Sequence, residues 1–232
     1  MPDTVFTPSL EQRLRAYHDL SARARSLVPG AAPKPVITLS REFGCEAYPV
    51  AEELVSIAER KSDERWLLAD ISLLDAVAKE HNISEDQMLS LGHKSRWLDD
   101  LFATFSAHWK TDSEYYRLLC EQVVTLARLG NVVFVGLGAA IITRSMHNCF
   151  HFRLIADHDF KVRSIARRME VPKQDAETIV AEQQKERDRM IRNLLDADEH
   201  QPLYYHMIFN NGSIPHKEIA RIIAGYVFKN EG

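Results

Sequence analysis

The sequence predicts an α/β protein in which helices cover both faces of a parallel sheet, a three-layer arrangement. Three short apolar runs, residues 36–40, 131–135 and 152–156, have the length and composition typical of central parallel strands. Longer stretches with helical periodicity separate them, and strands that alternate with helices indicate a parallel sheet. With 232 residues, of which 45% are hydrophobic, the chain can bury one substantial core.

The composition argues against several classes of protein. A formal net charge of -4 lacks the basic surplus that nucleic-acid-binding proteins usually carry. The three cysteines, Cys45, Cys120 and Cys149, are too few and too scattered for a disulfide framework. No stretch is long and apolar enough to cross a bilayer, so we expect a cytoplasmic protein without a membrane partner.

The chain begins with a predicted amphipathic helix over residues 8–28. Its apolar residues recur at helical spacing, with charged residues between them: Leu10, Leu14, Tyr17 and Leu20. Gly30 and Pro33 then interrupt the helix. We therefore expect residues 1–34 to form a helix with a linker and residues 35–232 to form the main domain.

The main domain opens with the strand over residues 36–40 and a turn over residues 41–48. A helix follows from Pro49, since proline is tolerated in the first turn of a helix. Further helices are predicted over residues 72–81, 84–91 and 113–129. Together they make a helical insert over about residues 62–128.

The second half of the domain alternates strands and helices in the same way. Densely charged helices are predicted over residues 161–169 and 175–195. A last strand follows over residues 207–209 and a closing helix over residues 215–228. Strands and helices thus alternate up to the last predicted helix, as expected for a parallel sheet.

The first strand-to-helix loop carries a recognisable sequence. It reads Ser40-Arg41-Glu42-Phe43-Gly44-Cys45-Glu46-Ala47 and resembles the Ser-Arg-Glu-aromatic-Gly-Ser-Gly-Gly loop of the cytidylate kinase-like family. Residues 130–139 are similar to the family's Gly-Asn-Val-Val-Ile-Val-Gly-Arg-Gly-Ala. The resemblance runs from Val36 to the C-terminus. It implies a P-loop NTPase fold with a helical insert that binds a nucleoside monophosphate, and a lid over about residues 170–200.

The resemblance also implies a reaction, the transfer of the γ-phosphoryl group of ATP to CMP or a related nucleotide with Mg²⁺. The residues that would hold ATP are Ser40, Arg41, Gly44, Cys45, Glu46 and Ala47. The acceptor side would be lined by Asp70, Gly136, Leu137 and Gly138. Arg187 and Arg192 in the lid would join Arg41 as catalytic residues that close over the transferred group. No metal ligands are predicted.

Three residues depart from the family pattern in ways that affect this chemistry. Glu46 and Ala47 replace two glycines, and Glu46 adds a carboxylate where triphosphate oxygens should approach the backbone. Leu137 replaces an arginine that would face the acceptor, and leucine cannot donate hydrogen bonds to phosphate. Two hypotheses follow: an active nucleotide kinase in which Arg41 does the work of the missing lysine, or an inactive pseudokinase that serves as a regulatory or protein-interaction module. The departures favour the second.

Simpler interpretations remain open for several of these residues. Asp70 can serve as a helix cap, and the lid arginines can form a solvated helix face. Cys45 can be a redox-active thiol near a helix N-terminus or an ordinary small loop residue. The N-terminal helix can dock a protein partner or form a homodimer, which would suit the pseudokinase hypothesis.

Overall fold

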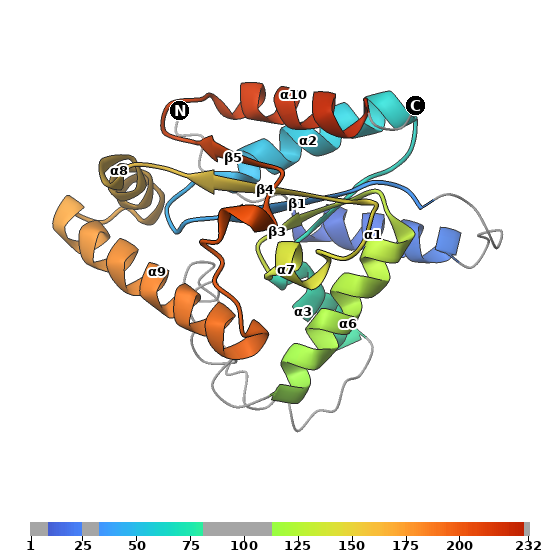
Figure 1. The fold of residues 1–232 in the computed structure, drawn as a ribbon, viewed down its shortest axis with the longest axis horizontal. Coiled ribbons are helices and arrows are strands. Elements are labelled where there is room, and N and C mark those ends of the chain that lie inside the picture. The colour runs from blue at the N-terminus through green and yellow to red at the C-terminus, as the bar shows by residue number, and fades with distance from the viewer. Residues whose placement is uncertain (1–8, 25–32, 81–112, 230–232) are drawn as a thin grey trace.

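The protein is built around a five-stranded sheet with the strand order β2-β3-β1-β4-β5 (Figure 1). It is seen in a computed structural model that describes residues 9–24, 33–80 and 113–229. Each pair of neighbouring strands is parallel, and helices cover both faces of the sheet. The predicted α/β fold is therefore confirmed.

Four of the strands coincide with predicted ones. β1 (Val36–Arg41), β3 (Val132–Val135) and β4 (Cys149–Ile155) overlap the three apolar runs, and β5 (Met207–Asn210) overlaps the predicted last strand. The edge strand β2 (Leu67–Ala69) was missed by the sequence analysis. Three residues are too few to show the period of a strand.

The helices agree with the predicted ones, apart from their ends. Along the chain they are α1 (Leu10–Ala24), α2 (Ala47–Ser62), α3 (Ile71–Glu80), α6 (Ser113–Leu129), α7 (Ala139–Ile142), α8 (His158–Met169), α9 (Lys173–Leu195) and α10 (His216–Val227), with a 3₁₀ helix η2 at Pro202–Tyr204. The short α7 was not predicted, and the helix expected over residues 84–91 lies outside the described residues. Within the described ranges, no helix combines the length and the apolar composition needed to cross a membrane.

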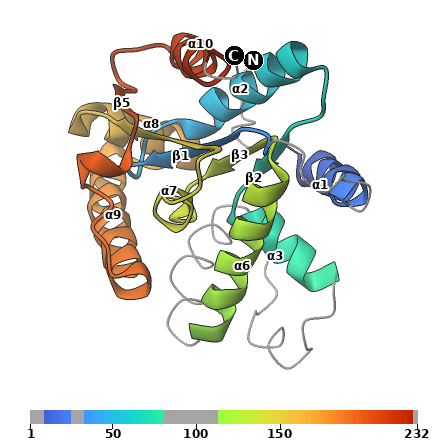
Figure 2. The same ribbon diagram turned by 45° about the vertical axis from the view of Figure 1, so that its right-hand side comes forward.

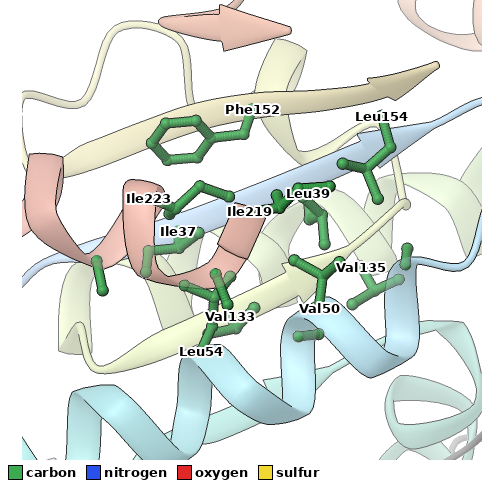
Figure 3. Packing of buried hydrophobic residues seen from close by; sticks show 14 of the residues in the cluster. Ile37, Leu39, Val50, Leu54, Val133, Val135, Phe152, Leu154, Ile219 and Ile223 are labelled. Carbon is green, nitrogen blue, oxygen red and sulfur yellow. The ribbon is translucent and has the colours of Figure 1, made fainter. Parts of the chain in front are cut away.

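α2 and α10 cover one face of the sheet (Figure 2). Val50 and Leu54 of α2 and Ile219 and Ile223 of α10 pack onto strand residues such as Leu39 (Figure 3). Complete burial of an aliphatic side chain of this size contributes about 1.5–3 kcal/mol. This packing fixes β1, the strand that leads into the predicted phosphate-binding loop.

A second apolar cluster lies on the opposite face and joins α1, α3 and α6 to the sheet. We name it the lower cluster; its members include Tyr17 of α1, Val123 of α6 and Phe134 of β3. Leu14 and Leu20 of α1 pack against it. The sequence left open that α1 docks a protein partner or forms a homodimer. In the structure the apolar side of α1 packs against the chain's own domain.

Candidate functional site

The carboxyl ends of the strands bring most of the predicted site residues to one edge of the sheet. β1 ends at Arg41, and residues 42–46 connect it to α2. Asp70 directly follows β2, and residues 136–138 follow β3. β1 lies between β3 and β4, so its carboxyl end is a switch point of the kind at which open α/β sheets bind ligands.

Several backbone N–H groups of the predicted phosphate-binding loop have acceptors within the chain. Phe43 N donates to Oε1 of Gln184 at 2.7 Å, and Glu46 N donates to Oδ1 of Asn211 at 2.7 Å. Glu42 N donates to the carbonyl oxygen of Leu154 at 3.0 Å. A phosphate at this loop would need these same donors. The loop is therefore closed by two amide side chains from distant parts of the sequence.

α8 also fastens the loop. Glu42 pairs with Nζ of Lys161 at 2.8 Å, and Glu46 accepts hydrogen bonds from Ser164 and Arg167 of the same helix. A side chain at Gly44, where φ is +94°, would come within 2.9 Å of the Lys161 Cα. Gly44 thus allows α8 to approach the loop closely. The Glu46 carboxylate, predicted to repel a triphosphate, is engaged by α8.

Cys45 lies in this loop with a buried side chain. Burial, followed by the charge of Glu42, raises the pKa of its thiol to about 12. At neutral pH the sulfur is protonated, which makes it a poor nucleophile, so the geometry favours the ordinary loop residue over the redox-active thiol. Ser40 and Ala47, on either side of the loop, are buried as well.

Arg41 is a buried cation, with 8% of its surface exposed. Its guanidinium carbon lies 5.7 Å from the centre of the Tyr48 ring, and a side chain at Gly136 would come within 2.7 Å of its Nη1. Among the residues that the structure describes, Nη1 has no hydrogen-bond partner. A buried donor without an acceptor is costly, so this N–H group is available to a polar ligand.

Arg187 is the lid arginine that reaches the loop. Its Nη1 donates to the carbonyl oxygen of Arg41 at 2.8 Å, and its guanidinium carbon lies 5.8 Å from the centre of the Phe43 ring. Burial and, after it, the positive charge of Arg41 lower the pKa of Arg187 to about 10. Arg192 lies on the exposed surface of α9. The structure therefore brings Arg41 and Arg187 together but leaves Arg192 apart.

α9, the predicted lid helix, is anchored near both ends. Ala176 near its start packs with Val162 of α8, and Ile191 near its end packs with Ile141 of α7. Figure 1 shows α9 next to α8, along the lower left of the molecule. This double anchoring holds Arg187 against the loop.

Asp70 is buried, and both of its oxygens accept hydrogen bonds. Oδ1 accepts from Leu73 N at 3.0 Å, which caps α3, and from Nη1 of Arg13 at 2.5 Å. Oδ2 accepts from the hydroxyl of Tyr48 at 2.7 Å. The cap interpretation is thus confirmed, and the N-terminal helix supplies a buried counter-charge that the sequence analysis missed.

Gly136, Leu137 and Gly138 have φ values of 76°, 64° and 65°. The left-handed region costs a leucine about 1–2 kcal/mol. Packing offsets this strain, because Leu137 is buried in the lower cluster. A Cβ at Gly138 would lie 2.6 Å from Cδ1 of Leu195, so this glycine allows the end of α9 to come close. Position 137 therefore contributes to the core.

Most residues that complete this edge give no signal in the sequence. Gln184 and Asn211 lie 141 and 165 positions from their loop partners, beyond any local pattern. Arg13 has a signal that could have been used. It is three residues from Leu10 and four from Tyr17, which places a cation on the apolar side of the N-terminal helix.

Comparison with known proteins identifies the family. Residues 36–213 match the cytidylate kinase-like family. The chain belongs to this family. α1 precedes the matched residues. No curated protein matches the chain.

Solved structures with similar folds include three with low sequence identity. An uncharacterized protein from Eubacterium ventriosum ATCC 27560 has a TM-score of 0.60 at 18% identity, with 84% of this chain and 99% of that chain covered. TT1252 from Thermus thermophilus scores 0.49 at 16% identity, covering 87% and 100%. Shikimate kinase from Bacteroides thetaiotaomicron scores 0.45 at 15% identity, covering 84% and 98%. The first of these supports the fold of this cytidylate kinase-like protein and, at such identity, the fold alone.

The cytidylate kinase-like family implies ATP and Mg²⁺ as ligands. The carboxylates nearest the loop and β2 are each paired with a cation: Glu42 with Lys161, Glu46 with Arg167 and Asp70 with Arg13. Within the described ranges, no group of three or more His, Cys, Asp or Glu side chains could hold a metal ion. These paired carboxylates do not fit a resident magnesium ion.

Proposed function

We propose that this cytidylate kinase-like protein is a catalytically inactive member of its family that serves as a regulatory or protein-interaction module. The observation that carries the proposal is the closure of the phosphate-binding loop by Gln184 and Asn211, which accept the N–H groups of Phe43 and Glu46. Phosphoryl transfer depends on donors that are aimed at the phosphates. Donors that already have acceptors within the chain are poorly placed for ATP.

Opening the loop would break contacts on several sides. Besides the two amide side chains, Lys161 and Arg167 hold the loop to α8, and Arg187 holds the carbonyl oxygen of Arg41. A hydrogen bond contributes about 0.5–1.5 kcal/mol net, and a partly exposed ion pair about 0–1 kcal/mol. Full opening therefore costs several kcal/mol, which ATP binding would have to offset.

The test is a calorimetric titration with Mg-ATP and then with CMP, combined with an assay for CDP formation. The unmodified protein is compared with a variant that carries Gln184→Ala, Asn211→Ala and Glu46→Gly, which removes both amide acceptors and restores one family glycine. We expect no Mg-ATP binding by the unmodified protein and measurable binding by the triple variant. Leu137→Arg is left out, because it would bury a guanidinium in the lower cluster.

Gln183→Ala, one position before Gln184 on α9, is the matched control for a shortened amide side chain, and it should leave the unmodified protein's behaviour unchanged. The proposal is contradicted if the unmodified protein binds Mg-ATP with micromolar affinity and forms CDP. In that case the closed loop would open readily for its substrate.

The second candidate is an active kinase that transfers the γ-phosphoryl group of ATP to CMP or a related nucleotide. The observation in its favour is the pair of neighbouring buried cations, Arg41 and Arg187, with Nη1 of Arg41 unpartnered among the described residues. In this reaction Ser40, Arg41 and Gly44 would hold the ATP phosphates and Arg187 would stabilise the transferred group. Asp70 would place the acceptor through its fixed carboxylate.

Arg41→Gln separates the two candidates. If the protein is a kinase, this variant loses CDP formation while its circular dichroism spectrum stays that of the unmodified protein, because glutamine keeps part of the side-chain volume. If the protein is inactive, neither form makes CDP. Equal CDP formation by both forms would remove Arg41 from the catalytic assignment.

A further inference from the structure

A series of hydrogen bonds leads from the predicted phosphate-binding loop to the buried Arg153 of β4. Phe43 N donates to Oε1 of Gln184 at 2.7 Å, and Nε2 of Gln184 donates to Oδ1 of Asp188 at 2.7 Å. The same carboxylate oxygen lies 3.1 Å from Nε2 of His200, and Nδ1 of His200 lies 3.2 Å from Nη2 of Arg153. We name Gln184, Asp188, His200 and Arg153 the His200 network. It connects the loop to α9, to β4 and to the segment between α9 and η2.

The chemistry of its members fixes the direction of each hydrogen bond in the His200 network. An ionised carboxylate only accepts, so Asp188 holds the Nε2 end of Gln184 and turns Oε1 toward the Phe43 N–H. A guanidinium only donates, so Nδ1 of His200 accepts from Arg153. In this arrangement His200 is neutral and carries its proton on Nε2, from which it donates to Asp188.

Arg153 is held too firmly to move away from a second proton on His200. Its side chain is 2% exposed, and its Nη1 donates to the carbonyl oxygen of Glu199 at 2.8 Å and lies 3.0 Å from the Glu199 carboxylate. Its guanidinium carbon lies 5.6 Å from the centre of the Tyr205 ring. The side chains of His200 and Asp188 are 43% and 28% exposed. A proton on Nδ1 would therefore displace the imidazole and leave Arg153 in place.

Charges of both signs surround His200. The charged and titratable groups near it are Arg153 of β4, Arg187 and Asp188 of α9, and Asp198, Glu199 and Tyr205 of its own segment. Arg153 repels an imidazolium, whereas Asp188 attracts one. Because a charge-assisted hydrogen bond is roughly twice as strong as a neutral one, the imidazolium would leave Arg153 and stay paired with Asp188. The carboxylate oxygen that orients Gln184 would then move with His200.

We propose that His200 is a pH-sensitive positioning residue: neutral His200 holds Asp188 where it orients Gln184, and protonated His200 draws Asp188 away, which opens the loop at Phe43. Histidine side chains change charge between about pH 5 and 8. Since the closed form excludes a proton from Nδ1, closure is favoured at higher pH and weakens as the pH falls through this range. The inference rests on the proposed function, because it names what regulates the closed loop.

The experiment measures hydrogen exchange at the Phe43 amide by nuclear magnetic resonance in the full chain, with each rate divided by the intrinsic rate at that pH. The unmodified protein and His200→Gln are compared at about pH 7.5 and about pH 5.5. Glutamine carries no charge, and its Nε2 can still donate to Asp188. We expect protection of the Phe43 amide to fall about tenfold with pH in the unmodified protein and to stay constant in His200→Gln.

His147→Gln is the matched control for the change of side chain. His147 is exposed and precedes β4, so it lies at the amino end of that strand, away from the loop. This variant should keep the tenfold fall of the unmodified protein.

Asp188→Ala tests the second member of the His200 network. It should lower the protection of the Phe43 amide about tenfold at both pH values and remove the difference between them, because Gln184 loses the acceptor that orients it. Glu186→Ala, on the same helix, removes a carboxylate that pairs with Arg189, and it should behave as the unmodified protein does.

Equal protection of the Phe43 amide at both pH values in the unmodified protein would overturn the proposal, and so would an undiminished fall in His200→Gln. Both results would leave the closed loop of the proposed function standing. A Phe43 amide without protection at about pH 7.5 would contradict the closed loop itself, and the proposal for His200 would fail with it. The two failures are therefore distinguishable.

Discussion

Two neighbouring parts of the same sheet edge differ in whether their hydrogen-bond donors have acceptors within the chain. In the loop over residues 42–46, N–H groups suited to phosphate are bonded to Gln184 and Asn211. Beside the loop, Nε of Arg13 and Nη1 of Arg41 are buried without a partner in the described residues. A family motif can therefore indicate where a site lies without indicating which donors there are available to a ligand.

The difference has a simple chemical origin. A backbone N–H needs one acceptor, and a single amide oxygen satisfies it. A guanidinium carries five N–H donors in a rigid plane, and one carboxylate cannot reach all of them. One oxygen of Asp70 accepts a hydrogen bond from Arg13, and the other accepts one from the hydroxyl of Tyr48. The loop donors of Phe43 and Glu46 are therefore satisfied within the chain, whereas these two guanidinium N–H groups have no acceptor among the described residues.

The strongest test of the closed loop uses Cys45 as a reporter. The pKa of its thiol is raised to about 12, so at pH 8 its thiolate fraction, and with it the alkylation rate, should lie about a thousandfold below that of an unperturbed cysteine. Iodoacetamide labelling followed by mass spectrometry measures the rate at each cysteine. Cys149, a second buried thiol whose pKa burial raises to about 11, is the internal control.

Removing the two amide acceptors with Gln184→Ala and Asn211→Ala should speed the labelling of Cys45 and leave Cys149 unchanged. Rapid labelling of Cys45 in the unmodified protein would contradict the closed loop, since the loop would then be open much of the time. The N–H groups of the loop would then be available to a ligand, as those of Arg13 and Arg41 are.

The arginine side of the comparison is tested by Arg13→Gln. This change leaves Asp70 buried without its counter-ion, and breaking a buried ion pair costs about 3 kcal/mol or more of the free energy of unfolding. Urea denaturation measures the loss. Adding Asp70→Asn should recover most of it, because the uncompensated carboxylate is gone.

Arg15→Gln is the matched control on the same helix. Its pair with Glu11 is exposed, so the free energy of unfolding should change by no more than about 0.5 kcal/mol. If Arg13→Gln were as mild as Arg15→Gln, α1 would contribute nothing to the charge balance at Asp70. The Arg13–Asp70 pair would then contribute no more to stability than an exposed ion pair.

The sequence predicted the parallel sheet because its central strands are buried on both faces. Residues 36–40 and 131–135 are continuous apolar runs for that reason, and they became β1 and β3. β2 has three residues, and α7 has four, so neither is long enough to show a period. Short elements of this kind are fixed by tertiary contacts instead of by local pattern.

The candidate site was predictable only in part. The family resemblance placed Arg41 in the loop and Arg187 in the lid, and in the structure Nη1 of Arg187 donates to the carbonyl oxygen of Arg41. The motif could not show that Gln184 closes the loop, since that contact joins residues 141 positions apart. It could not show that Leu137 packs into the core, which depends on a left-handed backbone between two glycines. Contacts between distant segments are absent from a single sequence.

The last prediction concerns the role of Gly44, which can serve either a bound phosphate or the packing of α8. If the glycine served a phosphate, Gly44→Ala would reduce ligand binding and leave the stability of the free protein unchanged. The structure instead predicts a loss of about 2 kcal/mol in the free energy of unfolding without any ligand, because φ is +94° and the new Cβ would lie 2.9 Å from the Lys161 Cα.

Gly225→Ala is the matched control for the same change of side chain. A Cβ at Gly225 of α10 meets nothing within 4 Å, so alanine should raise the free energy of unfolding by roughly 0.5–1 kcal/mol through its better helix propensity. Thermal unfolding of the two variants in buffer without nucleotide measures both effects. Changes of opposite sign in the free energy of unfolding would show that Gly44 is needed for the contact with α8. If Gly44→Ala leaves the free energy of unfolding unchanged, the glycine is available for a role in ligand binding.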